Sequence, residues 1–186
     1  MAIAVMTAGA LAVMALHQVT TFGNMQSRQL STATQSAQTW VERLQRDAMR
    51  WTTGGPTTLL SPVLLANTQY LQSVAAPGAA PEWMTPAPAL ATESWGFDHF
   101  GRDTRAEAEM RYCTNIRMQW VYPGQAIRAD VRVWYLRSHT GVNAVPFVGC
   151  AAGTNPNTLT GQLQTLSFVH TSTVIRWTPM PAAGGP

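Results

Sequence analysis

The sequence predicts an α+β fold, in which one long N-terminal α-helix packs on a roughly four-stranded antiparallel sheet and a long αβ loop joins the two. Three observations predict it. Residues 1–53 keep a helical pattern of apolar side chains, residues 54–108 are rich in Pro, Gly, Ala and Thr, and residues 109–178 contain runs typical of strands. A helix followed by a group of strands is the order of elements that characterises an α+β domain.

The chain begins with an apolar segment, residues 1–16, which contains no charged side chain. This segment is shorter than the roughly 20 residues that span a bilayer, and the first basic residue, Arg28, lies too late for a secretory signal. We therefore expect residues 1–27 to be the hydrophobic half of the helix, continuing a membrane helix that begins upstream. Residues 18–27 are polar, and Gly23 among them is a weak point at which the helix can bend or melt. The side chains expected to contact membrane or filament neighbours are Ile3, Val5, Leu11, Val13 and Leu16.

The second half of the helix is expected over residues 28–53, because its apolar side chains recur on one face. At 100° per residue they form a stripe about 100° wide. Arg43 is expected on the opposite, solvated face, paired with Asp47 one turn later. Gly54 is expected to end the helix, since it precedes Gly55 and Pro56. The residues expected to pack the helix on the sheet are Leu30, Ala37, Trp40, Leu44 and Trp51.

A long connecting loop is predicted over residues 54–108, where repeated prolines exclude a continuous helix or strand. One short helix is expected within residues 62–73. A loop of this length is uncommon unless it is functional or docked on another surface. The aromatic side chains expected to hold the loop on the core are Trp83, Trp95, Phe97 and Phe100.

Four strands are expected within residues 109–178. The clearest evidence is the alternation of Val131, Val133 and Tyr135 with polar or charged neighbours, which is the period of a sheet with one buried face. Pro123 and Gly124 supply a turn between the first two strands. The strands are expected over residues 109–122, 126–137, 145–150 and 163–177, and residues 179–186 are expected to be a disordered tail.

Two cysteines, Cys113 and Cys150, lie in the strand-rich part of the chain. They lack the close CxxC spacing and the nearby partners of a metal site. A disulfide is the favoured interpretation and implies an oxidising compartment, whereas two free buried thiols remain the alternative.

The sequence offers no motif for catalysis or for a cofactor. Nucleophile elbows, dinucleotide and phosphate loops and zinc-protease motifs do not occur in it. The one local group of metal-ligating residue types is Asp98 and His99 with Asp103, for which a polar turn between aromatic residues is favoured over a cation site. All 12 basic residues are arginines spread along the chain, and the net charge is only +3, so no nucleic-acid partner is expected. We expect neither an enzyme nor a bound cofactor.

Three stretches carry a resemblance to a known family: the apolar residues 1–16, "AIRADVRVWYLR" at residues 126–137 and "TSTVIRWTP" at residues 171–179. Together with the predicted organisation, they resemble the type IV pilin superfamily, and within it the minor pilins of the PilV type. The superfamily's basic leader, cleavage glycine, aromatic first mature residue and early glutamate have no counterpart here.

The resemblance implies a subunit inserted in the inner membrane by its N-terminal helix, with residues 28–178 as a periplasmic globular head that later joins a pilus at the cell surface. The implied partners are major and other minor pilins, the inner-membrane assembly platform and inner-membrane lipid. Two alternatives stay open: a pseudopilin of a type II secretion system, and a membrane-anchored periplasmic binding module with an unrelated β domain.

Overall fold

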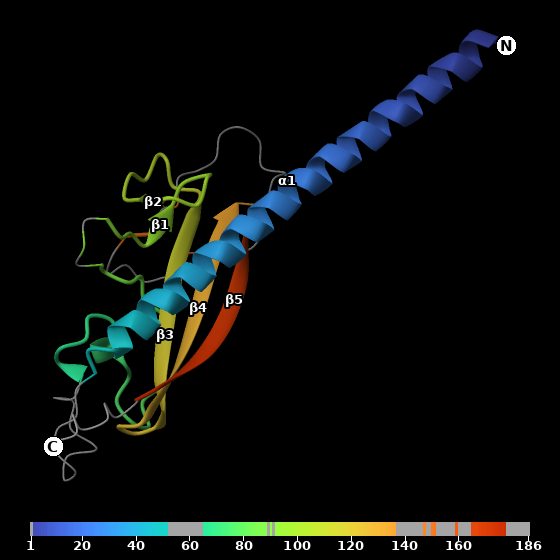
Figure 1. Cartoon of the computed structure of the whole chain (residues 1–186). Helices are drawn as coiled ribbons and strands as arrows, with labels where there is room; N and C mark the ends of the chain where they lie inside the picture. The colour runs from blue at the N-terminus through green and yellow to red at the C-terminus, as the bar shows by residue number, and fades with distance from the viewer. Residues whose placement is uncertain are drawn as a thin grey trace, which may run out of the picture.

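A computed structural model describes residues 2–51, 65–88, 90, 92–136, 147, 150–151, 159 and 165–177. One helix, α1 (Ala2–Ala48), crosses one face of an antiparallel sheet, and its N-terminal half extends well beyond the sheet (Figure 1). This arrangement confirms the predicted α+β fold class. The helix is continuous through Gly23, so it does not melt at this weak point.

The sheet has five strands in the order β2-β1-β3-β4-β5, and every pair of neighbours is antiparallel. The turn between β3 and β4 includes Gly124, whose φ of 74° lies in the region that favours glycine. The strands are β1 (Gly96–Phe97), β2 (Asp103–Thr104), β3 (Tyr112–Tyr122), β4 (Ala126–Leu136) and β5 (Leu166–Arg176).

The expected number of strands is nearly correct, but two strands lie where a loop was expected. β1 and β2 are two residues long each, which is too short to show the alternation that reveals a strand in a sequence. The predicted strand at residues 145–150 lies mostly outside the described residues, and its two described members, Phe147 and Cys150, are not in a strand. The predicted tail, residues 179–186, also lies outside them.

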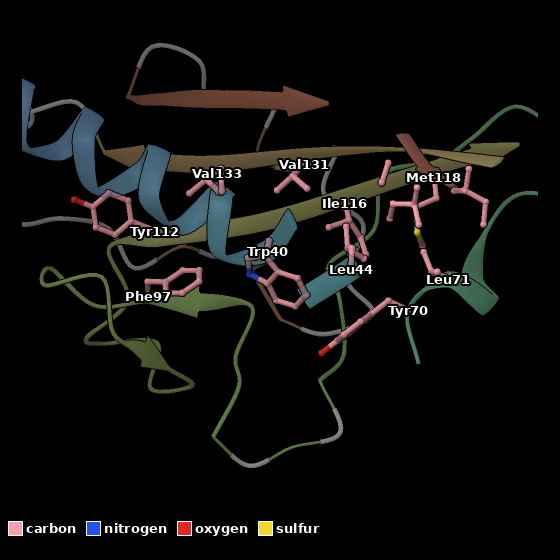
Figure 2. Close-up of a cluster of buried hydrophobic side chains, with 14 of the residues drawn as sticks. Trp40, Leu44, Tyr70, Leu71, Phe97, Tyr112, Ile116, Met118, Val131 and Val133 are labelled. Atoms are coloured by element: carbon pink, nitrogen blue, oxygen red, sulfur yellow. The ribbon is translucent and has the colours of Figure 1, made fainter. Parts of the chain in front are cut away.

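The hydrophobic core fills the space between α1 and the sheet. Trp40 and Leu44 of α1 are fully buried, and they pack with Ile116 of β3 and Val131 of β4 (Figure 2). Ala37 and Trp51, which the sequence also predicted for this role, belong to the same core. Alternate residues of β4 face this core, as the period of the strand predicts.

The loop between helix and sheet contributes its own residues to the core. The short 3₁₀ helix η2 (Leu71–Ser73) places Leu71 there, and it coincides with the end of the short helix predicted at residues 62–73. Residues 52–64, which include the predicted Gly54 helix stop, lie outside the described part.

The helix ends earlier than predicted, at Ala48. The backbone N–H groups of Met49, Arg50 and Trp51 each bond a carbonyl three residues back, which tightens the chain into a turn. Trp51 then points into the core, where its ring lies 5.6 Å from that of Trp120. The apolar stripe therefore continues past the helix, because a residue can join the core from the turn that follows it.

A disulfide joins Cys113 and Cys150, whose Cα atoms are 5.9 Å apart, so the favoured interpretation of the cysteines is confirmed. The bond lies in a second, smaller core on the face of the sheet that α1 does not cover. Trp95 supports it from the loop, because its indole N–H donates to the Cys150 carbonyl at 2.7 Å. The buried members of this core are Met110, Cys113, Trp134, Phe147, Cys150, Leu159 and Leu166.

Candidate functional site

The feature that most needs a function is the N-terminal half of α1, which we call the projecting segment (residues 2–30). At 1.5 Å per residue it extends about 40 Å, and Figure 1 shows it leaving the body of the molecule. Its described side chains carry no charge before Arg28. Its exposed large apolar residues are Met6, Leu11, Val13, Met14, Leu16, Val19, Phe22, Met25 and Leu30.

These apolar side chains do not form a single stripe. At about 100° per residue, Leu11, Leu16 and Met6 point to widely separated sides of the helix. A helix that is apolar on all sides is typical of one surrounded by protein or lipid. Because exposed apolar surface of this extent marks an interaction site in soluble proteins, the projecting segment is the candidate assembly surface.

The hydroxyl groups of this segment do not require water either. Thr20 and Thr21 donate their side-chain hydrogen bonds to the carbonyls of Leu16 and His17, one turn back on the same helix. Such internal bonds satisfy hydroxyl groups where no solvent is available. The segment is therefore suited to burial even at these polar positions.

Leu11, Val13 and Leu16 are exposed. That they contact membrane or filament neighbours stays a prediction. The side chains of Ile3 and Val5 lie outside the described residues. Leu30 was expected to pack on the sheet, and this is wrong: it is 48% exposed, because the first helix residue buried against the sheet is Ala33. Within the described residues, no helix is both long and apolar enough to cross a bilayer.

A buried polar cluster fixes the other half of α1 to the loop. Asp47, only 6% exposed, accepts hydrogen bonds from the backbone N–H groups of Gln69 and Tyr70 at 2.7 Å and of Leu71 at 3.1 Å. These are the donors at the start of η2 that a short helix leaves unpaired. One carboxylate thus joins α1 to a loop segment more than 20 residues away.

Arg43 extends this cluster to β2. Its guanidinium donates to the Asp103 carboxylate at 2.7 Å and to the Ser94 carbonyl at 3.1 Å. It lies over the rings of Trp40 and Phe97, at 4.9 and 5.7 Å from their centroids. Tyr70 closes the cluster by donating to Glu93, and burial, then the charge of Glu93, raises its pKa well above the ordinary range. The phenol therefore stays protonated.

The sequence analysis assigned Arg43 and Asp47 to the solvated face, and this is wrong, since both are buried and neither bonds the other. A signal for Asp47 was available, because it lies only about 20° from Trp40 on the helical wheel. Arg43 lies roughly 60° from Trp40, at the margin of the stripe. Their partners in the loop, however, follow no local pattern that a sequence reveals.

A second polar cluster lies on the face of the sheet away from α1. Burial alone would raise the pKa of Asp130, but hydrogen bonds from Ser172, Arg117 and Arg128 hold that pKa below its ordinary value. Next to it, the guanidinium of Arg132 lies between the rings of Trp83 and Trp134, at 4.2 and 4.5 Å.

Arg132 is 7% exposed, and its Nε and Nη2 atoms have no hydrogen-bond partner. Burial, then the charge of Arg117, lowers its pKa to about 10, so it remains charged at neutral pH. Trp83 thus holds its loop segment by stacking on arginine side chains. The sequence predicted that Trp83 holds the loop, but not that arginines are its partners.

The residues considered as a cation site have separate roles. Asp98 accepts the backbone N–H groups of Phe100 and Arg102, which forms a polar turn, while Asp103 bonds Arg43. The ring of His99 lies against that of Phe100. No group of metal-ligating side chains occurs in the described part of the chain. Phe100 was expected to hold the loop on the core, and this is wrong, because it is 66% exposed at the tip of the turn.

Comparison of the chain with protein-family models, with curated proteins and with solved structures found no match.

Proposed function

We propose that this chain is a structural and assembly subunit of the pilin type, a minor pilin of a type IV pilus. The observation that carries the proposal is the projecting segment: a helix whose residues 6–16 are exposed where described and apolar on all sides, and which continues without a break into a folded head. In such a subunit the segment packs among the helices of neighbouring major and minor pilins, and before assembly it is held in the inner membrane by lipid and the assembly platform.

The role of the head supports the same proposal. The buried bonds of Asp47 and Arg43 fix the helix to loop and sheet, so a force applied to the helix is transmitted to the whole head. A subunit that is inserted into or extracted from a filament through its helix needs such a connection. Because the polar clusters are used for packing, we propose a structural role and not a catalytic one.

The test is incorporation into filaments after a charge is placed in the projecting segment. We expect Leu16→Asp to remove the subunit from sheared pili, because a buried carboxylate without a partner is costly. The matched control is Leu90→Asp, since Leu90 is also exposed but lies on the head. Equal incorporation of both variants would contradict the proposal. Mass spectrometry of the native N-terminus from the same pili identifies peptidase processing.

A pseudopilin of a type II secretion system would have the same geometry. Deletion of the gene distinguishes the two: loss of piliation identifies the pilin, and loss of protein secretion with normal piliation identifies the pseudopilin. Deletion of a membrane-anchored binding module would alter neither, and the wild-type module would itself be absent from sheared pili.

A further inference from the structure

A cavity of about 290 Å³ opens where α1 leaves the sheet. Its walls come from four parts of the chain: α1, the turn before β2, the start of β3 and the end of β4. The residues that line it are Met25, Arg28, Gln29, Thr32, His99, Arg111, Tyr112, Tyr135 and Leu136. Two of these residues, Tyr112 and Tyr135, are also part of the core, so the cavity borders it. Figure 2 shows the hydroxyl of Tyr112 pointing away from Trp40.

The permanent charges in the cavity lining are all positive. Arg28 and Arg111 are its permanent charges, and no carboxylate belongs to the lining among the described residues. Asp98, next to His99 of the lining, accepts hydrogen bonds from two backbone N–H groups of its own turn. No described acidic group forms an ion pair with Arg28 or Arg111. Both guanidinium groups are therefore free to pair with a ligand carboxylate.

The floor of the cavity is apolar and rigid. Tyr112 and Tyr135 are both buried, and their ring centroids are 6.4 Å apart. Burial raises the pKa of the Tyr112 phenol, which therefore stays neutral and adds no negative charge. Met25 and Leu136 complete the apolar part of the lining.

The wall formed by the turn before β2 is held closely against the helix. Gly101 has a φ of 78°, and a Cβ atom there would lie 3.0 Å from the Thr32 methyl group. This close approach places His99 at the cavity. Beside it, the buried side-chain oxygen of Gln29 has no hydrogen-bond partner. This oxygen only accepts hydrogen bonds, as a carboxylate does, so the guanidinium groups of Arg28 and Arg111, and not Gln29, are the groups in the lining that can bind a carboxylate.

We propose that this cavity binds the carboxylate of an apolar or aromatic acid. The carboxylate accepts hydrogen bonds from Arg28 and Arg111, whose guanidinium groups match its geometry, and the carbon body lies over the tyrosine rings. The carboxylate is supplied either by a neighbouring protein, where an acidic side chain lies beside apolar or aromatic side chains, or by a free organic acid with an apolar or aromatic body. The proposal goes beyond the pilin assignment and does not depend on it.

The binding test uses the full chain in a non-ionic detergent, with ¹³C-methyl methionine as the NMR reporter and phenylacetate as the probe. We expect phenylacetate to shift the Met25 methyl signal in a saturable manner and to leave that of Met118, in the core, unchanged. R28Q and R111Q should each weaken binding at least about tenfold, because each removes a charged hydrogen bond. R176Q is the matched control, since Arg176 is exposed at the far end of β5.

Three results would overturn the proposal: no Met25 shift with phenylacetate, wild-type affinity in both R28Q and R111Q, or equal binding of the neutral analogue phenylacetamide. An unchanged Met118 signal shows that a variant is folded. If R111Q does not fold, R28Q decides alone, because Arg28 is exposed on the helix surface. A photo-crosslinking residue at Leu136 in cells identifies the source. A protein adduct that phenylacetate suppresses assigns the carboxylate to a neighbour, and binding without an adduct assigns it to a free acid.

Discussion

The two halves of α1 belong to one continuous helix but have opposite surroundings. From Ala33 onward, a narrow face of the helix is buried against the sheet and the opposite face is solvated. None of the described side chains at residues 6–30 is buried, although many are large and apolar. The comparison shows that the fold of the head explains only one half of the helix. The exposed apolar side chains of the other half are not covered by the head, which is why we propose that other subunits cover them.

The largest change in stability is expected when one apolar side chain is truncated in each half of α1, and the two results sharpen this comparison. Trp40→Ala should lower the free energy of unfolding by about 3–5 kcal/mol, because it leaves a cavity in the core. Leu16→Ala, in the projecting segment, should change it by less than about 0.5 kcal/mol, since the side chain contacts nothing in the head. Chemical denaturation of the full chain in detergent measures both. Similar losses would show that the projecting segment is part of the folded unit.

The next effect concerns the second core, which no part of α1 covers. Replacing Cys113 and Cys150 by serine should cost roughly 3–4 kcal/mol, because the bond closes a loop of 37 residues in the unfolded chain. Three samples are unfolded in denaturant and compared: oxidised wild type, reduced wild type and the double serine variant. If reduction and substitution leave the midpoint unchanged, packing of Trp134 and Phe147 holds this region without the bond.

The sequence was most informative where a pattern is local and long. The alternation in β4 and the stripe through Trp40 and Leu44 repeat over many residues, so strand and helix could be predicted with the correct buried faces. Leu30 continues that stripe but is exposed, because periodicity does not say where the sheet ends. β1 and β2 are too short to produce a pattern at all.

The polar clusters could not be predicted, for a related physical reason. Asp47 pairs with backbone groups near Tyr70, and Arg43 pairs with Asp103, so each bond joins residues far apart in the sequence. Charged residues at the edge of an apolar stripe are usually solvated, and only the docked loop makes these two exceptions. The cavity beside Arg28 and Arg111 depends in the same way on parts of the chain that no local pattern relates.

A smaller effect tests how firmly the loop holds the packed half of α1. Asp47→Ala should cost about 2 kcal/mol, because it leaves buried N–H groups of Gln69, Tyr70 and Leu71 without an acceptor. Glu42→Ala, on the exposed face of the same helix, is the matched control and should be nearly neutral. Denaturation midpoints give the two values. Hydrogen exchange at residues 69–71 should speed up in the first variant alone, and unchanged protection there would show that Asp47 is not their essential acceptor.

The smallest effect concerns the face of the sheet away from α1, where Asp130 is the acid among Arg117, Arg128, Arg132 and His170. Its pKa is lower in the folded state than the ordinary value of about 3.9, so the carboxylate stabilises the fold above that pH, and the contribution is lost as pH falls through the folded pKa.

Asp130→Asn should therefore cost about 1 kcal/mol at neutral pH, because its partners Arg117 and Arg128 are partly exposed and water replaces part of the lost interaction. The difference between variant and wild type should shrink as the pH falls below about 3.9 and through the lower folded pKa, where the wild-type carboxylate also becomes neutral. Unfolding free energies measured across that range decide the matter. A difference that stays constant with pH would mean that the side chain acts through packing and its hydrogen bonds, and that its charge contributes nothing to the stability of this face.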